Sequence, residues 1–379
     1  MTGAQGTCDP AFTAVREVFD ASLADGDDLG AAVAVFVDGR PVVDLWGGVA
    51  DAKTGRAWER DTECVTFSAT KAVTTTAALL LAERGAVDLD ARVTDWWPEF
   101  GVHGKESATG VHLLTHQGGL PAFDRPIGVE EAADAAAMAD QLAGQTPEWI
   151  PGADHGYHAV TFGWLAGELV RRHARASVGE FVRSTFGPAL SIGVPADRIA
   201  ALARIAAGRP LHVPAPHSPL ETLARATAAA NDPGSPMRRS MANPAASFNN
   251  PTLLAAGWPA AGLVCTARAL ADFYRRLVDG QILRPDTVHD AVRTRVSGPD
   301  RTLVQDSAFG LGFMRPSSVF FQPPAARRSA FGHPGASGAL GLGDLDCNLA
   351  IGYIPNLSRP MSGDPRAYRL VDAVYASLG

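Results

Sequence analysis

Ser68 and Lys71 stand three positions apart in the segment Ser-Ala-Thr-Lys. On the first turn of a helix, side chains at positions i and i+3 lie on one face, so a hydroxyl and an ammonium can meet there. The positive end of the helix dipole favours developing negative charge, and a neighbouring lysine can take the proton of the serine. This spacing therefore predicts a serine nucleophile with Lys71 as its proton partner. A serine that only caps the helix is the alternative.

The flanking sequence favours the nucleophile. Val65-Thr66-Phe67 is an extended, β-like segment, and from Ser68 to Arg84 apolar residues recur with helical spacing until Gly85. A strand followed by a helix is the setting in which hydrolases present a nucleophilic serine. Only three of the 33 basic residues are lysines, so a lysine inside a motif is more informative than usual.

Tyr157 is the second candidate. It lies in the run His155-Gly156-Tyr157-His158-Ala159, ahead of a helix that begins near Thr161. A lysine cation beside the phenol would lower its pKa, and the tyrosine could then accept the serine proton and return one to the leaving group. A buried structural tyrosine with a satisfied hydroxyl is the alternative, because such tyrosines far outnumber catalytic ones.

The third candidate is the glycine-rich segment 332–338, which reads Gly-His-Pro-Gly-Ala-Ser-Gly between two strand-like runs. Glycine allows a substrate to approach the backbone of a strand edge. An N–H group there, together with the N–H of Ser68, could hold the oxyanion of a tetrahedral intermediate. A hairpin turn without chemistry would explain the same residues.

Together these segments resemble the serine β-lactamase-like superfamily of penicillin-recognising proteins, which includes the class C β-lactamases, and most closely the family VIII carboxylesterases. The resemblance spans nearly the whole chain, including the segments 113–120 and 155–168, and the order and spacing of the motifs agree. It implies that Ser68 is the acyl-forming nucleophile, that Lys71 is its proton partner, and that Tyr157 is the tyrosine of the family's YxN motif.

The chain departs from the β-lactamase pattern at two places. Ala159 replaces the asparagine of YxN, and His333-Pro334-Gly335 stands where the family has a Lys-Thr-Gly triplet. In the β-lactamases these polar groups help to hold the amide and the carboxylate of the substrate. Their loss argues against β-lactam or acyl-D-Ala-D-Ala turnover and agrees with the HxG variant of the esterase branch. The resemblance makes the N–H of Ala336 the second oxyanion donor, with His333 and Gly335 beside the substrate.

We therefore expect a serine carboxylesterase that hydrolyses small or short-chain acyl esters without a cofactor. β-Lactamase or D-amino-acid peptidase activity, and acyl transfer to an alcohol, remain alternatives that would use the same residues. A penicillin-binding sensor that is acylated without turnover is the non-enzymatic alternative.

Two other hydrolase classes fit the sequence poorly. Residues 335–339 lack the final glycine of a G-x-S-x-G turn and leave no room for a following Asp and His, which argues against an α/β-hydrolase. The histidines at 103, 112 and 116, and at 155 and 158, match no known ligand spacing, so no metal is expected.

Strand signals at both ends of the chain predict the fold. Asp38-Gly39 between the apolar runs Ala31–Val37 and Pro41–Trp46 predicts a hairpin. Further strands are expected near the C-terminus, before a last helix at Tyr368–Leu378: Phe309–Met314, Ala330–His333, Ala339–Leu342 and Leu349–Ile354.

With helices between these ends, the sequence predicts an α/β (α+β) fold of the β-lactamase/transpeptidase-like type. An antiparallel sheet flanked by helices would be built from both chain termini and would carry an inserted helical domain. We expect residues 1–85 and 173–379 to form the α/β domain and residues 86–172 the helical domain. A polar arm would lead into the helix Phe12–Leu23, and Asn231–Pro251 would be a long surface loop or lid.

The composition argues against some classes of binding partner. A net charge of −7 argues against nucleic acid and anionic membranes, and 46% apolar residues allow a sizeable core. The four cysteines lack CxxC spacing, and no signal-like or membrane-length apolar stretch is present, so we expect a cytoplasmic protein with reduced thiols. The expected partner is a small-molecule ester, and the oligomeric state is not predicted.

Specificity is expected to depend on two loops, Phe123–Glu130 and Asn231–Trp258. Trp149, Phe248 and Trp258 could wall the acyl or alcohol pocket, although core positions suit them equally well.

Overall fold

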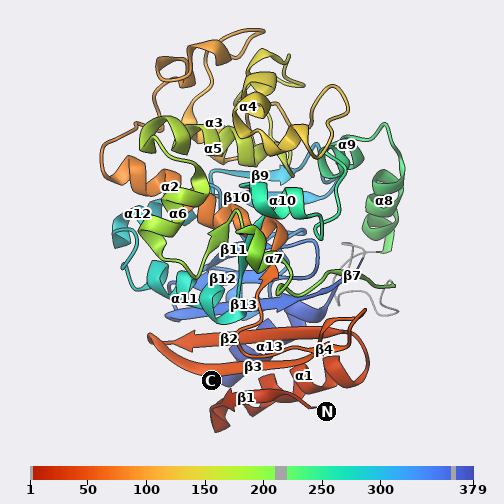
Figure 1. Cartoon of the computed structure of the whole chain (residues 1–379). Helices are drawn as coiled ribbons and strands as arrows, with labels where there is room; N and C mark the ends of the chain where they lie inside the picture. The colour runs from red at the N-terminus through yellow and green to blue at the C-terminus, as the bar shows by residue number, and fades with distance from the viewer. Residues whose placement is uncertain (1–2, 210–219, 360–363) are drawn as a thin grey trace.

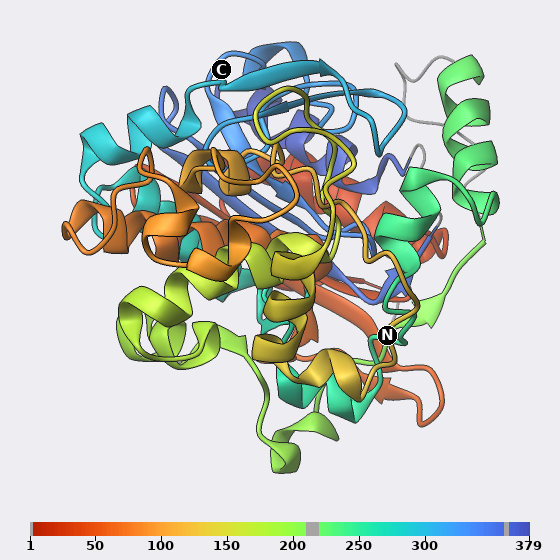
Figure 2. The ribbon, with the colours of Figure 1, turned by 90° about the horizontal axis from the view of Figure 1, so that it is seen from above.

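An antiparallel sheet built from both ends of the chain forms the centre of the protein. The structure is a computed structural model that describes residues 3–209, 220–359 and 364–379. The strand order is β1-β3-β2-β13-β12-β11, and β4 pairs with β3. The strands are β1 (Gln5–Cys8), β2 (Gly30–Val37), β3 (Arg40–Asp51), β4 (Arg56–Ala57), β11 (Ala330–Pro334), β12 (Leu340–Asp344) and β13 (Leu349–Pro355). Figures 1 and 2 show the red N-terminal strands beside the blue C-terminal ones, which confirms the predicted architecture.

The hairpin between β2 and β3 turns at Asp38-Gly39, as predicted. Both residues have positive φ, 48° and 73°, which is the conformation that a two-residue hairpin turn with the twist of the flanking strands requires. β2 then pairs with β13 on its other side, with Val33 opposite Tyr353. This pairing joins the two ends of the chain.

Alternate side chains of β2 enter two different cores. Ala32, Ala34 and Phe36 pack in the core that also contains α2 (Thr70–Glu83) and α11 (Ala267–Val278). Residues 31, 33 and 35 pack in the core with α1 (Thr13–Ala24) and α13 (Arg366–Ser377). Because both faces are covered, β2 reads as a continuous apolar run rather than an alternating one.

Smaller elements surround this centre. The helices are α3 (Gly110–Leu114), α4 (Ala135–Gly144), α5 (Thr161–Ala174), α6 (Val178–Phe186), α7 (Ala196–Ile199), α8 (Leu220–Asn231), α9 (Pro236–Ala242), α10 (Pro251–Ala256) and α12 (Pro285–Val292). The short strands are β5 (Cys64–Val65), β6 (Ser191–Ile192), β7 (Ala206–Ala207), β8 (Leu263–Cys265), β9 (Val296–Pro299), β10 (Asp306–Phe309) and β14 (Leu357–Ser358). Within the described residues, no helix is long and apolar enough to cross a membrane.

Three local predictions were wrong. The N-terminal arm contains β1, whose exposed strand carries little apolar signal. The predicted loop Asn231–Pro251 contains α9, which begins with Ser235 as N-cap and Pro236 in its first turn. The predicted strand Phe309–Met314 is wrong beyond Phe309, because the chain turns there: the Gly310 N–H donates to the Phe313 carbonyl, and Gly312 has φ 72°. The division into an α/β domain and a helical domain at 86–172 stays a prediction.

Candidate active site

Ser68 lies on a tight turn between β5 and α2. A 3₁₀ turn at Phe67–Ala69 precedes α2, and Ala69 rather than Ser68 is the N-cap of that helix. Phe67 has φ 51°, a left-handed conformation that costs a side-chain-bearing residue about 1 kcal/mol or more. Its ring packs on Phe248 with the centroids 4.3 Å apart, and this contact helps to hold the turn. The serine is therefore presented by a strained turn and is not used as a helix cap.

Lys71 reaches Ser68 from the first turn of α2, three residues further along the chain. Its Nζ donates to Ser68 Oγ at 3.2 Å, to the Ala159 carbonyl at 2.7 Å and to the Ala260 carbonyl at 3.1 Å. The side chain is fully buried, and among the described residues no carboxylate forms an ion pair with it. Burial lowers the pKa of Lys71 well below its ordinary value. A lysine in this state can be neutral and can accept the proton of Ser68.

Tyr157 is buried beside this pair, but its pKa moves opposite to the prediction. Lys71 Nζ lies over the phenol ring, 4.8 Å from its centroid. Burial raises the pKa of Tyr157, and a hydrogen bond with Ser68 only partly opposes that rise. The predicted lowering by a lysine cation is therefore wrong, because burial of the phenol is the largest effect on its pKa. Tyr157 keeps its proton at neutral pH and is suited to donate it.

His333 is a neutral neighbour of the phenol. Its Nδ1 is 2.7 Å from the Pro334 carbonyl, so Nδ1 carries the proton, and Nε2 lies 3.5 Å from the Tyr157 hydroxyl. Burial, and then the charge of Lys71, lower the pKa of His333 to about 3. His333, which stands where the family has the lysine of Lys-Thr-Gly, therefore presents an uncharged hydrogen-bond acceptor, Nε2, to the Tyr157 hydroxyl.

Gly335 brings the end of β11 against the segment that precedes Ser68. A Cβ on Gly335 would lie 2.2 Å from the Thr66 carbonyl oxygen, so no larger residue fits without moving the backbone. Ala336 follows in a tight turn that the Gly338 N–H closes on the Gly335 carbonyl at 2.9 Å. The Ala336 N–H has no acceptor among the described residues. These contacts support the oxyanion role of Ser68 and Ala336, which stays a prediction.

Asp300, which the sequence analysis missed, anchors the backbone of Tyr157. Its Oδ1 accepts the N–H of Tyr157 at 3.0 Å and those of Thr302 and Leu303 at 2.8 and 2.9 Å. Its Oδ2 accepts the Ser307 hydroxyl at 2.8 Å. No sequence motif marks Asp300, because its contacts join a loop between β9 and β10 to a segment far away in the chain.

Ser240 on α9 holds the same segment from another side. Its hydroxyl donates to the Tyr157 carbonyl at 3.1 Å and accepts the Ala159 N–H at 3.0 Å. Ala159 is also the residue whose carbonyl accepts from Lys71. The helix that replaces the predicted loop therefore supports the site.

The cavity in front of Ser68 has a volume of about 190 Å³. Its walls are mainly apolar, and the described residues that line it include no lysine or arginine and one carboxylate, Asp364. The apolar lining residues are Met237, Leu303, Met314, Val319, Phe320, Phe321, Pro334, Ala336, Ala339, Leu340, Ala367 and Val371.

The predicted walls and loops contribute little to this cavity. Trp149, Phe248 and Trp258 do not line it, and from the two predicted specificity loops only Met237 does so. Phe248 packs under the serine turn instead, and Trp258 lines a second cavity. Residues of the segment 303–322 and of α13 line the cavity instead of those loops. Among the described residues, no group of three or more histidine, cysteine or acidic side chains could hold a metal ion.

Comparisons with known proteins place the chain in a family. A family model described as "Beta-lactamase" matches residues 15–376. The chain is 34% identical over 367 residues to "Esterase/beta-lactamase LipL" of Mycobacterium tuberculosis, covering 93% of this chain and 82% of the relative. A solved structure of a family VIII carboxylesterase superposes with a TM-score of 0.87 at 31% identity, covering 99% of each chain. The solved structure of a penicillin-binding protein homologue from Caulobacter crescentus superposes with a TM-score of 0.85 at 33% identity, covering 99% of this chain and 100% of that one.

The chain therefore belongs to the Beta-lactamase family and has the β-lactamase/transpeptidase fold. It is a serine hydrolase of the esterase type within that family.

Asp300→Asn tests the anchoring of Tyr157. The amide removes the charge and puts an NH₂ group where an acceptor is needed, so we expect the free energy of unfolding to fall by about 2 kcal/mol. Urea denaturation measures this change. The exposed Asp306→Asn is the matched control and should change the value by less than about 0.5 kcal/mol. Equal values for the two variants would contradict the anchoring role.

The buried histidines predict loss of stability in acid. Burial, only partly opposed by the hydrogen bond to the Gly156 carbonyl, lowers the pKa of His158 to about 4. An unfolded histidine has a pKa of about 6.5. Because the folded pKa is the lower one, the contribution of His158 is complete above about pH 6.5 and is lost as the pH falls towards 4.

We expect the urea midpoint to fall over that range and His158→Gln to make the fall shallower. The exposed His289→Gln should keep the wild-type slope. An unchanged slope in His158→Gln would show that this histidine is not held neutral.

Proposed function

We propose that the protein is a carboxylesterase that hydrolyses small or short-chain acyl esters through an acyl-enzyme on Ser68. The observation that carries this proposal is the contact of 3.2 Å between Ser68 Oγ and Lys71 Nζ, made by a lysine whose burial lowers its pKa. A neutral amine at hydrogen-bond distance is the base that a serine nucleophile needs. The relatives named as esterases support the same reaction.

Acylation follows from the positions of three side chains. Lys71 takes the proton of Ser68, and the serine oxygen attacks the ester carbonyl carbon. The N–H groups of Ser68 and Ala336 hold the oxyanion of the tetrahedral intermediate. When the intermediate collapses, the bond between the carbonyl carbon and the alcohol oxygen breaks, and Tyr157 gives its proton to that oxygen. The phenolate of Tyr157 then takes back a proton from the Lys71 ammonium, whose Nζ lies 4.8 Å from the centroid of the phenol ring, so both groups are reset before water attacks.

Deacylation repeats these steps with water in place of the alcohol. Lys71 takes a proton from the attacking water, the bond between the acyl carbon and the serine oxygen breaks, and Lys71 gives the proton to that oxygen. The free acid leaves, and Lys71 and Tyr157 return to their starting states. An alcohol that replaced water here would give the acyl transfer that the sequence leaves as an alternative.

The charge of the cavity favours esters over β-lactams. Among the described residues, the lining has no cation to pair with the carboxylate that β-lactams carry, because His333 is neutral and Arg366 behind it is already held by Asp28 and Asp364. Apolar walls instead suit an uncharged acyl chain. A cavity of about 190 Å³ limits that chain to a small one.

Ser68→Ala is expected to abolish hydrolysis of p-nitrophenyl butyrate, because no other group can form the acyl-enzyme. A fluorophosphonate should add once to the unmodified protein, and intact-mass spectrometry with peptide mapping should place the adduct on Ser68. Ser318→Ala, a serine that also lines the cavity, is the control and should keep its activity and its adduct.

Retained hydrolysis in Ser68→Ala, or an adduct elsewhere, would contradict the proposed nucleophile. The same preparation should hydrolyse the butyrate ester far faster than a chromogenic cephalosporin. The reverse order would identify a β-lactamase, and an adduct without turnover would identify a sensor.

Tyr157→Phe separates proton donation from nucleophilic attack. An alkyl alcohol needs a proton to leave, whereas p-nitrophenolate leaves without one. We therefore expect kcat for ethyl butyrate to fall about 100-fold or more, and kcat for p-nitrophenyl butyrate to fall much less. Tyr368→Phe, on the wall of the same cavity, should change neither rate by more than about twofold. Equal losses on both esters would contradict the role of acid.

A further inference from the structure

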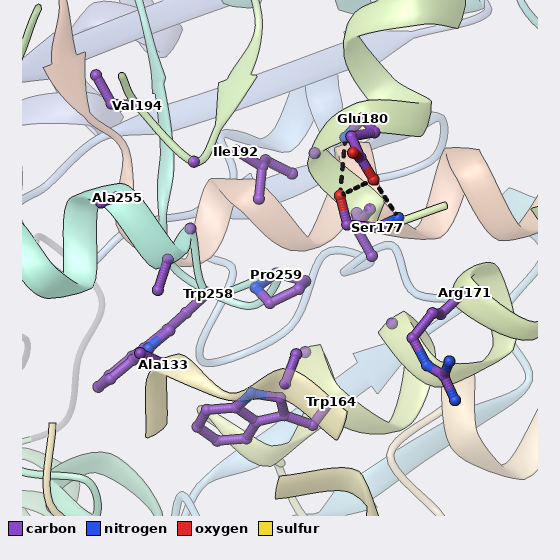
Figure 3. Close-up of a pocket in the computed structure, with 18 of the residues that line it drawn as sticks. Ala133, Trp164, Arg171, Ser177, Glu180, Ile192, Val194, Ala255, Trp258 and Pro259 are labelled. Atoms are coloured by element: carbon purple, nitrogen blue, oxygen red, sulfur yellow. Dashed lines mark hydrogen bonds between the residues drawn. The ribbon is translucent and has the colours of Figure 1, made fainter. Parts of the chain in front are cut away.

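A second cavity, of about 350 Å³, lies between α5, α6 and the segment that leads to β8. It shares no lining residue with the cavity in front of Ser68. Figure 3 shows its apolar wall, in which Trp164, Trp258, Pro259 and Ile192 come from three different parts of the fold. A concave, apolar space of this size suits a small organic molecule.

Two indole rings form one side of this cavity. Trp164 and Trp258 lie with their ring centroids 5.7 Å apart and their planes at 57°. Such a tilted pair presents aromatic surface to a flat ring, which gains from offset or edge contacts as well as from burial. The ligand that this wall favours is therefore aromatic.

The indole N–H of Trp164 provides a hydrogen-bond donor in the cavity. Trp164 is only 2% exposed, and its N–H has no acceptor among the described residues. In Figure 3 the nitrogen edge of the ring faces Pro259 across the cavity. A ligand with an acceptor atom in the cavity can take this hydrogen bond.

The charges at the rim favour a negatively charged acceptor. The carboxylate of Glu168 is held by Arg171 at 2.6 Å and by Arg172 at 2.5 Å. The carboxylate of Glu180 accepts the N–H and the O–H of Ser177, both at 2.8 Å. Arg183, in contrast, enters no ion pair within the described part of the chain. Arg183 is exposed, and its charge helps to lower the pKa of Glu180, but its N–H groups form no hydrogen bond with a described residue and can reach a carboxylate at the rim.

We propose that this cavity is a second ligand site that binds a small aromatic carboxylate. The ring lies against Trp164 and Trp258, and the carboxylate points to the rim, where Arg183 attracts it. The site is independent of acyl chemistry, because Ser68 takes no part in it.

The test uses 2-naphthoate as the probe and the Ser68→Ala protein, in which no ester chemistry can interfere. We expect saturable, one-to-one binding, seen as fluorescence energy transfer from tryptophan to the probe and counted by equilibrium dialysis. Ala133→Trp should weaken binding at least tenfold, because Ala133 is exposed at the rim and a large ring there fills the entrance. Ala137→Trp, also exposed but outside the cavity, is the matched control.

A second variant tests the charge. Arg183→Gln should weaken 2-naphthoate binding about fivefold or more and leave binding of the neutral 2-naphthamide unchanged. Arg40→Gln, an exposed arginine away from the cavity, should alter neither probe.

Three results would overturn the proposal. They are an absence of saturable binding, equal affinity in Ala133→Trp and Ala137→Trp, and loss of binding when Ser68 of the unmodified protein carries a phosphonate. The last result would show that the probe occupies the cavity in front of Ser68. Because binding is measured directly, an inactive esterase with an intact second site would be recognised as a separate failure.

Discussion

The burial of the Lys71 amine is the constraint on which the rest of the site depends. An ammonium group removed from water is costly unless acceptors surround it, and here two backbone carbonyls and one hydroxyl do so. The carbonyls belong to Ala159 and Ala260, so α2, the segment before α5 and the segment before β8 must meet at one point. A Cβ on Gly163 would lie 2.4 Å from the Ala260 nitrogen, which shows how closely α5 approaches that segment. The low pKa of the amine is thus a property of the packing of three segments.

The segment that carries Tyr157 is held by buried polar groups instead of apolar packing alone. Its backbone bonds to Asp300, Ser240 and His116, and His158 accepts the N–H of Leu120 at 2.9 Å. Burial keeps the histidines neutral, so they act as hydrogen-bond partners without adding charge beside Lys71. Such a network fixes the phenol within the reach of Ser68 but leaves stability sensitive to acid.

Local spacing was sufficient to predict the parts of the site that lie close together in sequence. Ser68 and Lys71 lie three residues apart where a turn leads into α2, and the Asp-Gly turn joins adjacent strands, so short-range patterns reveal both. Residue chemistry made Tyr157 and the segment 332–338 candidates only, the resemblance to a known family favoured them over the structural alternatives, and both lie beside Ser68 in the cavity. The oxyanion role of Ala336, the domain division and the cytoplasmic location stay predictions.

Features that depend on tertiary placement could not be predicted in the same way. Asp300 contacts Tyr157 across a large sequence distance, and nothing in its local pattern marks it. The direction of the Tyr157 pKa was wrong because it depends on how deeply the phenol and the amine are buried together. Phe248 was expected to wall a pocket, but its position beneath Phe67 is decided by α9 and α10, of which the sequence showed only a polar, proline-containing stretch.

The pairing of β2 with β13 also sets the order in which the protein can fold during translation. Val33 leaves the ribosome long before Tyr353, its partner in the sheet, so β2 is made with β3 along one edge, which β1 joins, and with its other edge unpaired. Until β11, β12 and β13 are made, the helix that follows Ser68 has no complete sheet to pack on. The sheet that supports the site can therefore close only after residues 349–355 have been synthesised.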